Sequence, residues 1–192
     1  MYTKQIVIFI LSNIFFLSSF GQKYDFVKVL PGKGIVFNND SILLFKTTVK
    51  DVCKILKIKD PTKPNEYTIS MWDGYSTVTG KDTSGTEYTQ EIKFKSLLFQ
   101  FDDDKDRKNL KLKWITTKED FSLKIYTDNG LEIGMINPKI EKIYSVLEKC
   151  DYVSENKLTY NLYTYGVSFQ LEKTAKNELK LVEISTHHTL KR

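Results

Sequence analysis

"LKLKWITT" occupies residues 110–117, and "LKLVEIST" occupies residues 179–186, which is 69 positions later. Five of the eight positions are identical. In both stretches the alternation of apolar residues shifts by one position before the isoleucine, at Ile115 and at Ile184. A shared irregularity of this kind indicates a β-bulge that belongs to a repeated unit. The sequence therefore predicts an internal duplication.

A second offset, of 91 positions, aligns two candidate helices. The stretch "TVKDVCKILKIKD" at residues 48–60 matches "KIEKIYSVLEKCD" at residues 139–151 without a gap. In both stretches apolar residues recur at i, i+3, i+6 and i+7, which places them on one face of a helix. The same offset aligns residues 67–74 with residues 158–165. Both of these segments alternate as strands do.

These alignments predict an α+β protein built from two tandem units. Each unit consists of a strand or hairpin, a helix and three antiparallel strands, with the helices on one face of the sheet. Unit 1 covers residues 22–117, with an inserted hairpin at about residues 75–95, and unit 2 covers residues 118–192. A unit of this size is near the lower limit for an independent core, so we expect the two units to pack as one compact body.

Residues 1–21 have the layout of a secretory signal peptide. Lys4 precedes the apolar stretch "IVIFILSNIFFL", and small residues lead to a cleavage point before Gln22. The apolar stretch is too short to span a bilayer comfortably, and no cysteine for lipid attachment lies near the cleavage point. We expect a secreted or periplasmic protein without a stable membrane anchor after cleavage.

Charge and cysteine content narrow the functional classes. The 29 basic and 24 acidic residues are interleaved, and no concentrated basic stripe for a phosphate backbone is visible, so we expect no nucleic-acid partner. An oxidising compartment allows a disulfide between Cys53 and Cys150, but these residues occupy different places in the aligned helices. The sequence leaves that bridge open.

The residue patterns of common catalytic and metal sites are absent from the sequence. His187 and His188 are the only histidines; adjacent strand residues point in opposite directions, so we expect a frayed tail and no metal site. Residues 102–109 resemble a calcium loop but lack its glycine and closing glutamate. No G-x-S-x-G elbow, P-loop or dinucleotide fingerprint occurs. The sequence thus predicts neither an enzyme nor a cofactor.

Aromatic residues recur on one parity of the predicted strands. Trp72 and Tyr163 hold matching positions among small polar residues, and the bulge turns Trp114 to the same side. Aromatic anchors with short polar neighbours are typical of protein-binding surfaces, although tyrosine and tryptophan are also common in ordinary sheets. Tyrosines of the inserted hairpin, and Tyr165 of the strand segment that contains Tyr163, complete the set. The predicted binding residues are Trp72, Tyr75, Tyr88, Trp114, Tyr163 and Tyr165.

The stretch "KTTVKDVCKILKIKD" at residues 46–60, an aromatic strand after it, and "GVSFQL" at residues 166–171 carry a resemblance. They resemble the modules of the β-lactamase-inhibitory-protein-like family and of the small outer-membrane-assembly lipoproteins. The resemblance implies a helical layer on an antiparallel sheet. In the inhibitor, two tandem copies present an aromatic sheet face to an enzyme, which implies a protein partner in the cell envelope or outside the cell.

The sequence therefore favours a non-enzymatic protein-binding module. Two narrower alternatives stay open. One is an immunity or inhibitor protein that acts against a toxin or hydrolase. The other is a carbohydrate-binding or small-ligand-binding protein that uses the same aromatic side chains.

Overall fold

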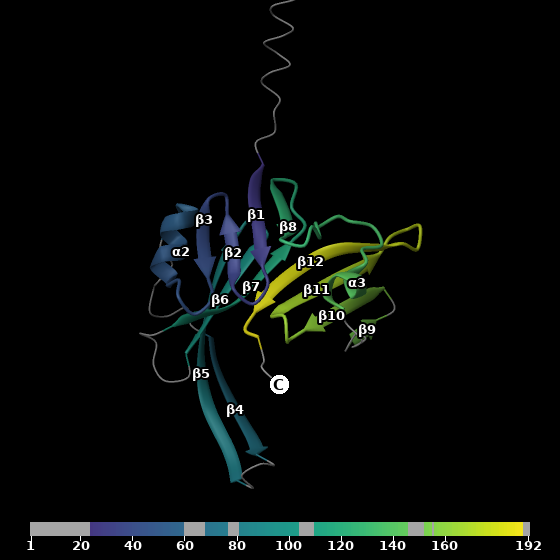
Figure 1. Cartoon of the computed structure of the whole chain (residues 1–192). Coiled ribbons are helices and arrows are strands. Elements are labelled where there is room, and N and C mark those ends of the chain that lie inside the picture. Colours follow the sequence, from purple (N-terminus) through teal and green to yellow (C-terminus); the bar gives the residue numbers. More distant parts are fainter. Residues whose placement is uncertain are drawn as a thin grey trace, which may run out of the picture.

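Two β-sheets stacked face to face make up the protein. The computed structural model describes residues 24–59, 68–76, 81–103, 110–145, 152–154 and 156–189. The strand order is β3-β2-β1-β8 in a four-stranded sheet and β4-β5-β6-β7-β12-β11-β10-β9 in an eight-stranded sheet. In Figure 1 the small sheet and both helices lie in front of the large sheet. The hydrophobic core fills the space between these two layers.

The small sheet joins two distant parts of the chain. Its strands are β1 (Asp25–Leu30), β2 (Gly34–Phe37), β3 (Asp40–Leu43) and β8 (Leu123–Thr127). Strand β1 is antiparallel to β2 but parallel to β8. Val27 and Val29 of β1 are completely buried because alternate residues of the strand point toward the large sheet.

The large sheet is antiparallel throughout. Its strands are β4 (Thr68–Ser76), β5 (Lys81–Phe94), β6 (Leu97–Asp103), β7 (Lys111–Lys118), β9 (Tyr152–Ser154), β10 (Lys157–Leu162), β11 (Val167–Lys173) and β12 (Leu179–His187). In its central strands alternate residues face the small sheet, and most of these are apolar. The buried members include Leu97, Phe99, Phe101, Leu112, Ile115, Val167, Phe169, Leu171, Leu181 and Ile184.

Two short helices flank the small sheet on the same side of the large sheet (Figure 1). They are α2 (Val49–Leu56) and α3 (Ile140–Tyr144), so their first residues are 91 positions apart, as predicted. Thr48 caps α2: its hydroxyl accepts the N–H of Asp51 at 3.3 Å, and the Asp51 carboxylate accepts the N–H of Thr48 at 3.0 Å. Helix α3 has no side-chain cap and only five residues.

The predicted α+β class, with a layer of helices on the sheet, is wrong. Strands predominate, and only two helices occur in the described part of the chain. An eight-residue helix such as α2 is about 12 Å long. Eight strands extend over about 34 Å, so two such helices are too short to cover them. The four-stranded sheet provides that cover instead, and the helices fill its margins.

The predicted bulge is confirmed at both places. On β6, Gln100 pairs with Trp114 but the next residue, Phe101, pairs with Leu112, which leaves Lys113 as the extra residue of β7. On β11 the register shifts between Gln170 and Leu171. Gln170 pairs with Glu183 of β12 and Leu171 pairs with Leu181, which leaves Val182 as the extra residue of β12. The two bulges are therefore 69 positions apart, the offset of the repeated stretch.

Strands β7 and β12 meet at the middle of the large sheet. Thr116 pairs with Ser185, which is its own counterpart in the repeated stretch. On one side of this pair Ile115 faces Thr186, and on the other side Thr117 faces Ile184. Reciprocal pairing of this kind is the pattern of a two-fold symmetric contact. The division into units at residues 22–117 and 118–192 stays a prediction.

The sheet revises one alignment within the predicted repeat. Strand β10 pairs with β11 as the end of β5 pairs with β6: Tyr160 lies opposite Phe169, and Ile92 lies opposite Phe99. By position in the sheet, β10 therefore corresponds to the end of β5 rather than to residues 67–74. Strand β5 lies within the hairpin expected at about residues 75–95, but its partner β4 already begins at Thr68, and the inserted hairpin stays a prediction.

Candidate functional site

The face of the large sheet that points away from the core has a polar centre. Thr116 on β7, Ser185 on β12 and Ser168 on β11 lie there, and each is at most 8% exposed. The hydroxyl of Ser185 donates to the hydroxyl oxygen of Thr116 at 3.1 Å, at the pairing that relates the two repeated stretches. The small sheet and the helices lie on the opposite side (Figure 1), so none of the described elements is stacked on this face.

Two predicted binding residues meet on this face around a histidine. The rings of Trp114 and His187 stack with their centroids 4.3 Å apart and an interplanar angle of 20°. Tyr163 approaches the same imidazole at 5.4 Å, tilted by 52°. Trp114 is also held by its indole N–H, which donates to the hydroxyl oxygen of Thr116 at 3.1 Å. We call Trp114, Tyr163, Ser168 and His187 the His187 cluster.

His187 is held by hydrogen bonds on both ring nitrogens. Nδ1 lies 3.0 Å from the carbonyl oxygen of His188, and Nε2 lies 3.1 Å from the hydroxyl oxygen of Ser168. A carbonyl oxygen only accepts, so Nδ1 carries the proton and Nε2 accepts from Ser168. Burial lowers the pKa of His187 below its usual value, which keeps the ring neutral at pH 7.

The prediction that His187 belongs to a frayed tail is wrong. It is the last residue of β12 and is 2% exposed. The alternation of Glu183, Ser185 and His187 on one parity was a signal that the strand continues to this point. Its contact with Ser168, on the neighbouring strand, is a tertiary feature that periodicity does not reveal.

In the contact between Ser168 and His187, the imidazole has the tautomer that a general base requires. Both side chains are buried, however, and a nucleophile has to be reached by its substrate. In this arrangement the hydrogen bond fixes the orientation of the imidazole. The chemistry that the cluster offers is thus contact through the rings of Trp114 and Tyr163.

The other predicted binding residues lie elsewhere. Tyr165 packs against Tyr144 of α3 at 5.2 Å, on the side of the sheet that carries the core. Trp72 and Tyr75 belong to β4, opposite Gly85 and Asp82 of β5, and Tyr88 belongs to β5. The side chains of these three residues are outside the described part of the chain, so their role stays a prediction.

The structure describes one of the two cysteines. Cys53 is buried in α2, within the core. Cys150 lies outside the described residues. The disulfide between them therefore stays a prediction.

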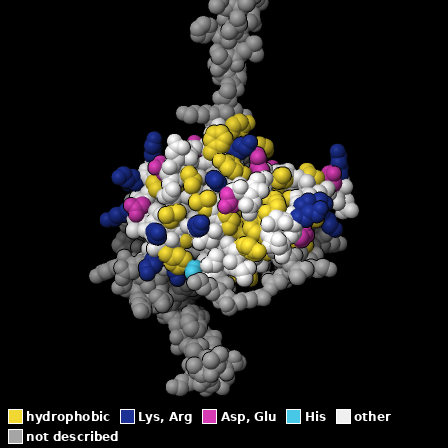
Figure 2. All heavy atoms as spheres, viewed as in Figure 1, with side chains coloured by type: hydrophobic (Ala, Val, Ile, Leu, Met, Phe, Trp, Pro, Cys, Tyr) yellow, Lys and Arg dark blue, Asp and Glu magenta, His cyan; other side chains and the backbone are white. Residues whose placement is uncertain are grey.

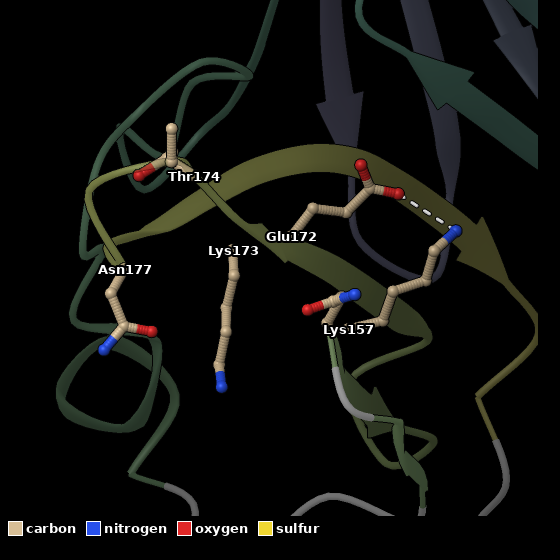
Figure 3. A pocket seen from close by; sticks show the side chains of 7 residues that line it. Lys157, Glu172, Lys173, Thr174 and Asn177 are labelled. Carbon is tan, nitrogen blue, oxygen red and sulfur yellow. Dashed lines mark ion pairs between the residues drawn. The ribbon is translucent and has the colours of Figure 1, made fainter.

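A hollow of about 580 Å³ lies at the open end of the β10–β11 hairpin, beside the turn between β11 and β12. Figure 3 shows its lining, in which Lys157 and Glu172 form an ion pair at 2.9 Å. Lys173, Thr174 and Asn177 complete its polar wall (Figure 3). All of these groups come from solvated strand ends and a turn, and none of them belongs to the His187 cluster.

The visible face of the small sheet is mixed in character. Figure 2 shows hydrophobic, basic and acidic side chains scattered over it, without a stripe of one charge. Within the described residues, no group of three or more His, Cys, Asp or Glu side chains is placed to hold a metal ion. None of the helices in that part of the chain is both long and apolar enough to cross a bilayer.

Comparison with known proteins found no relative. No family model matches the chain, and the searches of curated proteins and of solved structures returned no significant match. The resemblance to the inhibitory-protein-like modules and the assembly lipoproteins therefore stays a prediction. Any function has to be argued from the site itself.

Proposed function

We propose that this protein is a non-enzymatic protein-binding module, secreted or periplasmic, that contacts its partner through the outer face of the large sheet. Trp114 and Tyr163 are the anchor residues. The observation that carries the proposal is that both rings pack on His187, on the face where no described element is stacked. A narrower form of this function is inhibition of, or immunity to, a toxin or hydrolase.

The surroundings of the two rings suit an interface. Aromatic side chains contribute most to binding when their orientation is already set, because less conformational entropy is lost on association. The stack on His187 and the hydrogen bond to Thr116 restrict Trp114 in this way. The polar centre of the face is already satisfied internally, because Ser185 donates to Thr116. A partner therefore does not need to pair these hydroxyls when it displaces water.

Two tyrosines provide a matched test. Tyr163 is 42% exposed and Tyr165 is 43% exposed, but Tyr163 contacts His187 whereas Tyr165 contacts Tyr144 on the core side. We expect Tyr163→Ala to weaken binding of a partner captured from envelope extracts or culture medium by about tenfold or more. We expect Tyr165→Ala to retain it. Both variants should have cooperative thermal unfolding.

The capture experiment also separates the alternatives. A partner retained equally by both variants, or lost equally by both, would contradict the proposed surface. Binding of mature protein to a glycan array, with no protein captured, would favour the carbohydrate-binding alternative instead. A captured hydrolase or toxin whose activity falls on binding would select the inhibitor form.

A further inference from the structure

The sheet edges of this protein are protected unequally. Edge strands are normally kept from pairing with other chains by shortness, by a covering segment, or by lysine and proline. Strands β9 and β3 are short, with three and four residues. Strand β8 is covered by the chain that follows it. The N–H of Thr127 donates to the carbonyl oxygen of Leu131 at 2.8 Å, and the N–H of Ile133 donates to the carbonyl oxygen of Ile125 at 3.0 Å.

Among the described residues, strand β4 has none of these protections. It has nine residues and is the end strand of the large sheet, with β5 as its neighbour among the described strands. Its sequence, "TISMWDGYS", contains no lysine, arginine or proline, and Asp73 is its only charged residue. Isoleucine, tryptophan and tyrosine, which favour strands, occur in it as well. An edge of this length and composition is suited to pairing with another strand.

Among the described strands, none pairs as a third strand along much of the arm formed by β4 and β5. All nine residues of β4 pair with residues 81–89 of β5, but β6 pairs with β5 only from Tyr88 onward. Figure 1 shows this two-stranded arm extending away from the rest of the protein. A two-stranded ribbon is marginally stable in water, and three or more strands are needed for independent stability.

We propose that β4 pairs antiparallel with β4 of a second copy of this chain, which joins the two large sheets across a two-fold axis. An edge is complementary to itself in antiparallel orientation, as the closed symmetry of most dimers requires. The two arms then lie side by side as a four-stranded ribbon. Because each arm extends beyond its own body, antiparallel arms place the two bodies at opposite ends.

The middle of the large sheet has the same kind of contact within one chain. There β7 and β12 pair antiparallel, and Thr116 faces its counterpart Ser185. A β4–β4 junction repeats this arrangement between chains at the sheet edge. It is independent of the proposed function, which uses the outer face at Trp114 and Tyr163.

Sedimentation velocity of the mature chain, from nanomolar to high micromolar concentration, tests this inference. We expect a reversible dimer. Successive residues of a strand direct their N–H groups to opposite edges of that strand. One of the variants Ser70→Pro and Met71→Pro therefore removes an N–H that is bonded to β5, and the other, the outward variant, removes an N–H that points to the free edge. We expect the outward variant to weaken dimerisation by about tenfold or more while the amide protection of the β4–β5 hairpin is kept.

Three results would overturn the inference. They are a monomer at every concentration, a dimer that survives in both proline variants, and a dimer that is lost in Tyr163→Ala. If both prolines abolish the dimer, Ser70→Lys decides, because it adds an edge charge and leaves every N–H in place. Loss of the dimer in Ser70→Lys supports β4 pairing, whereas its retention contradicts it. A monomer that binds an extended peptide along β4 would assign the edge to a different partner.

Discussion

Two pairs of side chains occupy equivalent positions on either side of the Thr116–Ser185 pairing, yet their chemistry differs. Trp114 lies opposite His187, and Lys118 lies opposite Glu183. The first pair is an aromatic stack at 4.3 Å. The second is an ion pair at 3.4 Å whose lysine and glutamate side chains are 63% and 22% exposed. One backbone arrangement thus carries a stacked aromatic pair at one end and a solvated charge pair at the other.

The difference shows that a repeated backbone does not imply a repeated site. Register, bulge and core packing recur 69 positions apart in β7 and β12 and 70 positions apart in β6 and β11, because they depend on main-chain pairing and on apolar alternation. The outward side chains are not constrained by the core, so each end is able to acquire its own chemistry. Only the end with Trp114 and His187 carries aromatic side chains, as the proposed binding surface requires.

The largest expected effect tests whether the two halves share their packing. Phe99 of β6 and Phe169 of β11 are both completely buried, at corresponding places beside the two bulges. We expect Phe99→Ala and Phe169→Ala each to lower the free energy of unfolding by about 3–5 kcal/mol, because each leaves a large cavity in the core. Denaturant unfolding measures both. Costs that differ by more than a factor of two would contradict equivalent packing.

The stacked pair should contribute more to stability than the ion pair. Trp114→Ala removes the stack on His187 and the hydrogen bond to Thr116. We expect a loss of about 2 kcal/mol, since the tryptophan is only partly buried and stacking adds about 1 kcal/mol to its burial. Urea unfolding against Lys118→Ala provides the comparison. Equal losses in the two variants would remove the energetic distinction between the two ends.

The stability of the protein should depend on pH through His187, at the end with the aromatic stack. Burial lowers the pKa of His187 from its ordinary 6.5, so the unfolded chain binds this proton more readily than the folded one. The free energy of unfolding should therefore fall as the pH is lowered through the unfolded pKa toward the folded one. We expect His187→Gln to have a shallower slope than the wild type below pH 6.5. Parallel slopes would show that His187 titrates alike in both states.

The smallest effect is expected at the ion pair. Glu183→Gln should change the free energy of unfolding by less than about 1 kcal/mol, because the partner Lys118 is largely exposed and solvent screens the charges. The difference from wild type should shrink further in high salt. Thermal unfolding at two ionic strengths measures it. A larger, salt-independent loss would mean that Glu183 has a structural role comparable to that of Trp114.

Local features of this fold could be predicted from the sequence, and distant pairings could not. The bulges left a visible break in alternation before Ile115 and Ile184, and the starts of α2 and α3 followed from apolar spacing. The parallel pairing of β1 with β8 joins residues such as Val27 and Ile125, which are far apart in the chain. Periodicity shows that a segment is a strand but not which strand it will join, so the second sheet was missed.

The candidate site was predicted only in part, because strand parity can be seen in the sequence whereas contacts between distant strands cannot. Strand parity, together with the bulge, placed Trp114 and Tyr163 on one side, and in the structure they meet at one imidazole. Tyr165, two residues from Tyr163, turns to the core side because the chain between β10 and β11 reverses there. His187 was assigned to a tail because its partner Ser168 is brought to it only by folding.

The proposed surface requires that the rings of Trp114 and Tyr163 be reachable on the face of the large sheet where none of the described elements is stacked. The most direct measurement is acrylamide quenching of Trp114 fluorescence in a Trp72→Phe variant of residues 22–192, where Trp114 is the only remaining tryptophan. We predict intermediate quenching in the folded protein and a clear fall when a captured partner is added. Emission that resists acrylamide in the protein alone, at the level of a core tryptophan, would contradict the account.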